Sequence, residues 1–398
     1  MKIAIIGGGA AGLMAASLIN NAEVTIFDSN DKCGRKLYIT GKGRCNLTNN
    51  CDKSVYLENV VRGKKFMQGA ISRFDSARAM EYFEALGLQL ITERGNRVFP
   101  ASNKSSDVIK ALTNACAHCD IKLKEKVLSV KKSGGGFSVK TSYATYQFDK
   151  VIVATGGKSY SATGSTGDGY KIAKSFGHTI TEPKPALVPI KLKRTFYQGL
   201  PLKNVTLNAN ADGKKYAEFG EMLFTTDGIT GPIVLTMSSL INRAREVELS
   251  LDLKPALSES QLDARILREF DVAKNKSLKS VMYTLLPKNF VEAFLSVIKI
   301  DGEQKVNSVT AETRARLING LKNFKLEYNG LYDIEAGIVT SGGVNLDEVS
   351  PKDMQSKLAE GLYFIGEVLD VDCLTGGFNL QTAFSTAYAC ALALNAQM

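Results

Sequence analysis

Short apolar runs separated by polar stretches occur at both ends of the chain, and the first begins at its second residue. Lys2–Ile6 (KIAII) and Glu23–Phe27 (EVTIF) are predicted as buried strands, and residues 13–19 (LMAASLI) between them as a helix. Asp28 stands at the end of the second strand. This order predicts a βαβ unit, the building block of an α/β fold.

The pattern changes in the middle of the chain and returns near its end. From about residue 187 short alternating strands dominate, Pro255 marks a boundary, and amphipathic helices follow over residues 258–320. Before residue 187 we expect helices at 74–86 and 108–119, a β-meander at 121–130, 137–141 and 144–148, and a buried strand at 150–154. Buried runs at 337–344 and 362–365 and a last helix at 381–395 then restore the α/β pattern.

These changes predict a discontinuous domain with an insertion. Residues 1–189 and 336–398 form the α/β domain, and residues 190–335 form the insertion. Within the insertion, residues 190–255 and about 322–335 form a β part, and residues 256–321 form a helical part.

A glycine-rich turn joins the first strand to the first helix. Gly7, Gly9 and Gly12 match G-x-G-x-x-G. The glycines of this motif allow a tight turn, close approach of a pyrophosphate and close packing of helix on strand. Phosphates would sit at the helix N-terminus, where unpaired N–H groups and the helix dipole favour an anion. Asp28 can bind ribose hydroxyls and repels a 2′-phosphate, which favours FAD or NAD over NADP at this site.

Composition and charge limit the class of protein. The 398 residues are 44% hydrophobic and 23% charged, as in ordinary globular proteins of two or three domains. No apolar run reaches about 18 residues, so we expect no membrane span. Seven cysteines without a secretory signal indicate reduced thiols and a cytoplasmic protein. The net charge of +10 is scattered; it favours anionic cofactors or substrates and leaves nucleic acid as a less favoured partner.

Further motifs follow predicted strands. Residues 154–157 (ATGG) resemble the segment of two-dinucleotide-binding-domain flavoproteins that passes the FAD, and residues 165–169 (STGDG) resemble fumarate-reductase and aspartate-oxidase flavoproteins. Gly366 and Glu367 follow a strand near the C-terminus and resemble the second FAD signature of such proteins. The helix after them would point its N-terminus at the flavin pyrimidine and favour negative charge there.

Three longer motifs carry a more specific resemblance. They are residues 34–49 (GRKLYITGKGRCNLTN), Arg97–Pro100 (RVFP) and residues 220–232 (GEMLFTTDGITGP). The chain closely resembles the BaiN/YhiN-type NAD(P)/FAD-dependent oxidoreductases, also called aminoacetone-oxidase-like flavoproteins, over nearly its whole length. The resemblance implies a Rossmann-like FAD-binding domain with an inserted β-barrel plus helical domain. In one departure, this chain has Thr226 where the family often has a histidine.

The resemblance also implies which residues bind FAD. The glycine turn and Asp28 would hold the ADP half, Arg35 and Lys36 would lie by phosphate or ribose, and Val127 would contact adenine. Arg44, Cys45 and Asn46 would lie near the flavin and are the catalytic candidates, although each basic residue could instead form a surface ion pair. The full set of predicted cofactor ligands is Gly7, Gly9, Ala10, Ala11, Gly12, Asp28, Ser29, Arg35, Lys36, Thr40, Gly43, Arg44, Cys45, Asn46, Val127, Ala154, Thr155, Gly156, Gly366, Glu367, Asn379, Leu380 and Gln381.

The predicted function is an FAD-dependent oxidoreductase that transfers hydride between flavin N5 and a small organic substrate, with NAD(P)H as the other redox partner. Oxidation of the substrate with oxygen as acceptor fits the sequence equally well. Two alternatives stay open: a basic flavoprotein that binds RNA or a partner, and an FAD-linked dithiol reductase using Cys45 and Cys51. We favour unrelated thiols over the second, and helix packing over zinc or redox chemistry for residues 116–119 (CAHC), so no metal site is expected.

Overall fold

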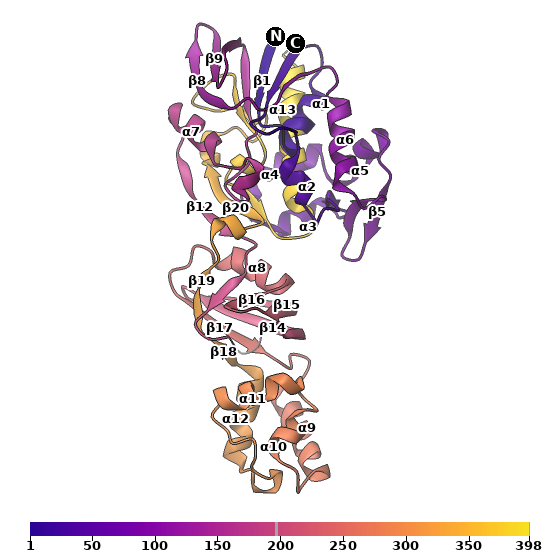
Figure 1. The fold of residues 1–398 in the computed structure, drawn as a ribbon, viewed down its shortest axis with the longest axis vertical. Coiled ribbons are helices and arrows are strands. Elements are labelled where there is room, and N and C mark those ends of the chain that lie inside the picture. Colours follow the sequence, from indigo (N-terminus) through magenta and orange to yellow (C-terminus); the bar gives the residue numbers. More distant parts are fainter. Residues whose placement is uncertain (196–197, 398) are drawn as a thin grey trace. The chain divides into compact units, whose positions relative to one another are not determined.

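The computed structural model describes residues 1–195 and 198–397 and divides into two compact units (Figure 1). Unit 1 comprises Met1–Ala186 and Asp333–Met398, and unit 2 comprises Leu187–Tyr332. Each unit has its own buried hydrophobic cluster. The sequence analysis places the two boundaries at 189/190 and 335/336, and the structure divides three residues earlier at both.

Unit 1 is built on a five-stranded sheet in the order β21-β11-β1-β2-β7, in which every neighbouring pair is parallel. Ile3, Ala4 and Ile5 of the central strand are fully buried, as expected for a parallel strand covered on both faces. Because the strands are parallel, the glycine turn after β1 and the segments after β11 and β21 lie at the same edge of the sheet. The strands are β1 (Lys2–Ile6), β2 (Glu23–Phe27), β7 (Asp120–Lys122), β11 (Lys150–Val153) and β21 (Leu362–Phe364).

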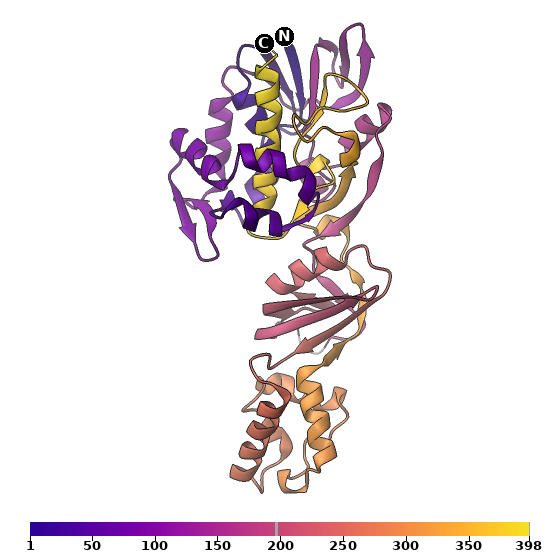
Figure 2. The same ribbon diagram turned by 180° about the vertical axis from the view of Figure 1, so that it is seen from behind.

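The C-terminal helix α13 (Phe378–Asn395) lies inside unit 1, where Figure 2 shows it in yellow. It packs on α1 (Ala10–Leu18) and on α4 (Lys64–Arg73), so it is buried on nearly all sides. The other elements of unit 1 are α2 (Arg35–Ile39), α3 (Lys53–Glu58), α5 (Ser76–Ala85), α6 (Ser105–Ala115), α7 (Asp168–Ser175), β3 (Thr48–Asn49), β4 (Val60–Arg62), β5 (Leu90–Glu93), β6 (Arg97–Pro100), β8 (Val127–Ser133), β9 (Gly136–Thr141), β10 (Thr145–Phe148), β12 (Ile180–Ala186), β20 (Val339–Val344) and β22 (Asp372–Cys373).

Two predictions about the first half of the chain are wrong in detail. The expected strand at 121–130 is two strands: β7 joins the parallel sheet, and β8 starts the antiparallel meander with β9 and β10. A turn separates them, because Lys124 has a left-handed φ of 55° and its N–H bonds to Asn30 O. The stretch between the two expected helices also holds the hairpin β5–β6, whose turn contains Gly95 and Asn96 with positive φ.

Unit 2 contains a seven-stranded sheet, in the order β18-β17-β14-β15-β16-β13-β19, with helices outside it. All its pairs are antiparallel. The end strands β18 and β19 follow each other with only Glu327 between them, so one stretch of chain pairs with β17 on one side and with β13 on the other. This stretch closes the sheet, as expected for the β-barrel part of the insertion. The elements are β13 (Ile190–Leu192), β14 (Pro201–Ala211), β15 (Lys214–Phe224), β16 (Gly228–Thr230), β17 (Val247–Asp252), β18 (Phe324–Leu326), β19 (Tyr328–Leu331), α8 (Pro232–Ile241), α9 (Glu259–Val272), α10 (Leu278–Met282), α11 (Lys288–Val297) and α12 (Ala311–Lys322).

Candidate functional site

The glycine turn after β1 leaves open space at the start of α1. A Cβ on Gly9 would meet nothing within 4 Å, whereas a Cβ on Gly7 would lie 2.5 Å from Ala154 O, and one on Gly12 would lie 1.9 Å from Gly7 O. Gly7 and Gly12 are therefore required for packing. Gly9 borders space that a ligand can enter.

The N-terminus of α1 is suited to an anion. Gly9 is the N-cap residue, no side chain caps the helix, and its first turn holds no acidic residue. The first-turn N–H groups, which include those of Ala10 and Ala11, have no partner within the helix. Together with the helix dipole they favour a phosphate at this position. The open space at Gly9 and these N–H groups fit the pyrophosphate of a dinucleotide.

Asp28 lies at the end of β2 beside this turn. Its carboxylate accepts hydrogen bonds from Gly8 N (2.9 Å) and from the main-chain N and the Nδ2 of Asn30 (2.8 and 2.9 Å). Asn30 Oδ1 in turn accepts a bond from Arg35 Nη1 at 3.0 Å. The carboxylate is thus fixed beside the phosphate site, where it can bind the hydroxyls of a ribose. Ser29 next to it is exposed, and Val127 is buried at the start of β8.

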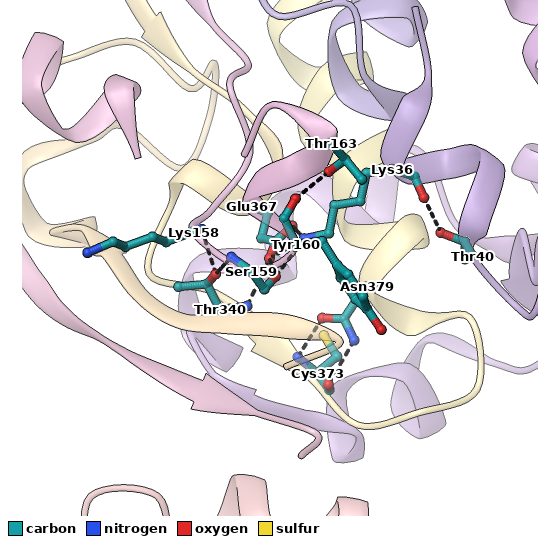
Figure 3. A network of polar contacts seen from close by, with 10 residues as sticks. All are labelled: Lys36, Thr40, Lys158, Ser159, Tyr160, Thr163, Thr340, Glu367, Cys373 and Asn379. Atoms are coloured by element: carbon teal, nitrogen blue, oxygen red, sulfur yellow. Dashed lines mark hydrogen bonds and ion pairs between the residues drawn. The ribbon is translucent and has the colours of Figure 1, made fainter. Parts of the chain in front are cut away.

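A second cluster joins the segments after β11 and β21 (Figure 3). Lys36 Nζ of α2 lies 2.7 Å from Glu367 Oε2 and 3.0 Å from Oε1, and it donates to Ser159 Oγ at 2.8 Å. Glu367 Oε1 also accepts the main-chain N–H of Thr340 at 2.8 Å. The two charged side chains are only 23% and 22% exposed, so their attraction is less screened by water than that of a surface pair.

Thr340 ties this cluster to the loop after β11. Its Oγ1 accepts the main-chain N–H groups of Lys158 (2.8 Å) and Ser159 (3.1 Å), as Figure 3 shows. A Cβ on Gly157 would lie 2.4 Å from the same Oγ1 and 2.9 Å from Glu367 Oε1. The sequence predicts residues 337–344 only as a buried strand and singles out neither Ser159 nor Thr340. The run Thr340-Ser341-Gly342-Gly343 was a signal, because such polar and glycine residues are unusual in a covered strand.

The start of α13 lies in the same unit. Gly366 packs so closely that a Cβ on it would lie 2.8 Å from Ala11 Cβ and 3.9 Å from Ala383 Cβ, which places α1 and α13 next to the second signature. Asn379 closes the loop before the helix: its Oδ1 accepts Cys373 N at 2.9 Å, and its Nδ2 donates to Cys373 O at 2.8 Å (Figure 3). No side chain caps α13, so its first N–H groups, including that of Leu380, can serve a ligand.

Gln381 has a different role from the one predicted. Its Nε2 donates to Phe74 O at 2.9 Å and to Ser385 Oγ at 3.0 Å, and its Oε1 accepts Thr48 Oγ1 at 2.6 Å. Its main-chain N–H bonds to Gly377 O at 3.1 Å. All its donors are used inside the protein and the residue is 1% exposed, so Gln381 holds α13 to α4 and β3.

The loop between α2 and β3 holds the three catalytic candidates. Arg44 turns toward the β5–β6 hairpin: it pairs with Glu93, donates to Asn103 Oδ1 at 2.7 Å, and lies 4.2 Å from the centre of the Phe99 ring. Asn46 Oδ1 is buried and has no hydrogen-bond partner among the described residues. Such an acceptor suits a ligand that donates a hydrogen bond. Thr40 and Gly43 also belong to this loop. The main-chain O of Thr40 accepts a hydrogen bond from Cys45 N at 2.9 Å.

The cysteines are mostly buried, and two of them bond to the main chain of α1. Cys45 is fully buried, and burial raises the pKa of its thiol far above the ordinary value. Cys116 and Cys119 donate to Leu13 O and Ala16 O, so the CAHC segment packs on α1. All seven thiols are free, and in residues 1–195 and 198–397 no group of three or more histidine, cysteine or carboxylate side chains is placed to hold a metal ion.

Comparison with known proteins identifies the family. The model for the HI0933-like protein Rossmann domain matches residues 1–393. The chain belongs to the HI0933-like family. This confirms the resemblance and the Rossmann-like fold drawn from the sequence, and makes the chain a member of a family of flavoprotein oxidoreductases. In the described residues of this HI0933-like protein, no helix is both long and apolar enough to cross a membrane.

Curated relatives cover almost the entire chain. The 3-dehydro-bile acid delta(4,6)-reductase of Clostridium scindens is 30% identical over 97% of this chain and 97% of its own length. The ribosomal RNA dihydrouridine synthase of Escherichia coli is 31% identical over 97% and 96%. Among solved structures, the open conformation of a flavocytochrome c3 fumarate reductase matches with a TM-score of 0.50 at 15% identity, over 99% of this chain and 78% of that one. That likeness concerns the fold alone.

Proposed function

We propose that this HI0933-like protein is an FAD-dependent reductase that saturates a carbon–carbon double bond conjugated with a carbonyl group, using NAD(P)H as reductant. The observation that carries the cofactor part of the proposal is the open space at Gly9, next to the uncapped start of α1 and the fixed carboxylate of Asp28. When bound, FAD supplies the hydride chemistry. The net change adds two hydrogens to the substrate and oxidises the nicotinamide.

The residues of unit 1 divide the work of holding the cofactor. The N–H groups at the start of α1 would bind the pyrophosphate, and Asp28 would bind ribose hydroxyls. Lys36 would lie near phosphate or ribose with its ammonium group fixed by three oxygen contacts, two of them to Glu367, which balances its charge. Asn46 would use its unpaired amide oxygen to accept a hydrogen bond from the ligand.

The names of the relatives support the reaction type. A 3-dehydro-delta(4,6) reductase and a dihydrouridine synthase both add hydrogen across a ring double bond, and in both rings a carbonyl lies in conjugation with it. Hydride then adds to the carbon far from the carbonyl and a proton to the carbon beside it. Reduction of a double bond, rather than oxidation of an amine, is therefore the direction we propose.

Ribosomal RNA becomes the first candidate substrate because two relatives, from Escherichia coli and Haemophilus influenzae, are named ribosomal RNA dihydrouridine synthases. A net charge of +10 attracts a polyanion, whereas it offers little to a neutral ring ketone. A small conjugated ketone is the second candidate, supported by the bile-acid relative. A dithiol reductase is disfavoured by the buried Cys45, whose raised pKa keeps the thiol protonated.

The test starts from the purified protein. It should be yellow, with flavin absorbance near about 450 nm. We expect NADH or NADPH to bleach this absorbance without oxygen, and uridine-containing ribosomal RNA or a cyclic conjugated ketone to restore it. A protein that does not bind FAD, or whose reduced flavin is reoxidised by neither class of acceptor, would contradict the proposal.

A further inference from the structure

Four exposed cations surround the loop that holds Arg44. They come from three segments of unit 1: the α2–β3 loop, the β5–β6 turn with the first residue of β6, and the loop before α6. We call them the basic rim: Lys42, Arg94, Arg97 and Lys104. All four side chains are exposed.

Specific contacts join the three segments into one surface. Arg44 links all of them, since it pairs with Glu93 at the end of β5, bonds to Asn103 and lies over Phe99 of β6. The main chain adds a bond from Ser105 N to Gly43 O at 2.8 Å. The guanidinium of Arg97 lies 5.9 Å from the centre of the Phe99 ring, on which Arg44 also packs. The rim is therefore held in place by the same residues that fix the loop.

The positive charge of this surface is only partly balanced by the protein, through Glu93. The hydrogen bond from Arg44 lowers the pKa of the Glu93 carboxyl, and the charges of Arg44 and of the rim residue Arg97 lower it further. Over the described part of the chain, no rim residue lies within ion-pair distance of a carboxylate, which contrasts with Lys36, Arg44 and Arg62 in the same unit. Cations left unpaired at neighbouring positions repel one another, and an external anion relieves that repulsion.

We propose that the basic rim is the surface on which the phosphate backbone of a single-stranded RNA segment docks, so that a uracil base can reach the loop of Asn46. This rests on the proposed function. Four separate cations spread over three segments suit a chain of phosphates better than one phosphate group of a nucleotide. Phe99 is covered by Arg44, so the rim supplies backbone contacts and no free stacking surface.

The test uses the FAD-loaded full chain and ribosomal RNA transcribed in vitro, which carries no modified bases. The variant Arg94→Gln/Arg97→Gln/Lys104→Gln removes three rim charges. The control Lys131→Gln/Lys140→Gln/Lys174→Gln removes three exposed charges from β8, β9 and α7, on the other side of unit 1 (Figure 1). Both variants have the same net charge. A difference in RNA binding between them therefore reports the basic rim and not the overall attraction of the protein for a polyanion.

We expect the rim variant to bind the RNA about tenfold or more weakly at moderate salt, and its log K versus log salt slope to fall by about 2. The control should keep the wild-type slope to within less than about 1 unit. Arg94→Lys/Arg97→Lys, which retains both charges, should bind nearly as the wild type does. Equal losses in the rim and control variants, or loss of NADPH oxidation with RNA binding unchanged, would overturn the proposal.

Two readouts separate this proposal from the proposed function. Flavin absorbance reports whether each variant still holds FAD, and reoxidation by a cyclic conjugated ketone reports the reaction without RNA. Suppose that neither the ketone nor the RNA reoxidises the flavin, while the rim substitutions still weaken RNA binding. The proposed reaction is then contradicted, and the proposed RNA-docking surface is kept. If reoxidation occurs and the rim substitutions do not weaken RNA binding, only the proposal about the basic rim is contradicted.

Discussion

At the scale of single residues, neighbouring glycines of one motif do different things. Gly12 lies where a Cβ would overlap Gly7 O, and Gly9 lies where a Cβ would meet no atom within 4 Å. Gly9 also has φ −84° and ψ −165°, a conformation open to any residue. Close packing therefore explains why position 12 is a glycine. At position 9 no protein atom requires a glycine, and we attribute it to a bound ligand.

This difference makes a matched pair of variants. Gly9→Ala should change the free energy of unfolding of the apoprotein by less than about 0.5 kcal/mol, since nothing is displaced, but should weaken FAD binding at least about tenfold. Gly12→Ala should destabilise the apoprotein by about 3 kcal/mol, because helix and turn must separate. Denaturant unfolding of both apoproteins and flavin titration of Gly9→Ala measure these effects. Unchanged FAD affinity in Gly9→Ala would contradict the binding of the pyrophosphate next to Gly9.

At the scale of elements, a buried histidine joins two parts of unit 1. His178 follows α7, and its Nε2 lies 2.7 Å from Ser356 Oγ in the C-terminal segment, while its Nδ1 lies 3.2 Å from Glu348 Oε2. Ser356 Oγ already accepts the N–H groups of two residues that follow it, so its own proton points to the imidazole. This arrangement needs a neutral ring that accepts at Nε2.

The protonation of His178 gives stability a pH dependence. Burial lowers the pKa of His178 below its ordinary value of 6.5, although Glu348 opposes the shift. A histidine with a lowered pKa in the folded state contributes stability that is full above the unfolded pKa and declines as pH falls through about 6.5 toward the folded pKa. Urea unfolding at pH 7.5 and pH 5.5 should show this decline, and His178→Gln should reduce it. An identical decline in the variant would assign the effect to other groups.

An element could be predicted where its pattern is local in the sequence, and could not where distant residues decide its pairing. The order β1, α1, β2 could be read because an apolar strand, a glycine turn and a helix each leave a local pattern. The division of residues 121–130 into β7 and β8 could not, because pairing with β2 rather than with β9 is decided by contacts far away in sequence. The same limit applies to the site: the role of Gln381 depends on the carbonyl of Phe74, 307 residues earlier in the chain.

At the scale of the whole molecule, the chain folds as two units with separate cores. Leu187–Tyr332 is contiguous and encloses its own hydrophobic cluster. Its ends are close, because Tyr332 N bonds to Pro189 O at 3.2 Å. In unit 1, Ala186 is paired with Val339, so the two ends of the insertion site are also neighbours. Insertion of a domain at such a point leaves both cores intact.

Deleting the insertion tests this division. We expect a chain in which a short Gly/Ser linker replaces residues 187–332 to fold cooperatively and to bind FAD, because every cofactor residue we predict lies in unit 1. The excised segment 187–332 should also melt cooperatively and stay colourless when FAD is added. Circular dichroism melts and flavin absorbance of both pieces measure these outcomes, and a shortened chain that folds but stays colourless would place part of the FAD site in the insertion.

The position of α13 has a consequence for how the protein is made. This helix is the last element of the chain, yet it packs on α1, which is among the first. The ribosome adds residues one after another, at about 5–20 per second, so the central segment can fold while the N-terminal part still waits for its partner. The helix α13 can reach α1 only after the whole central segment has been made, and we expect a chain truncated before Phe378 to lose FAD binding.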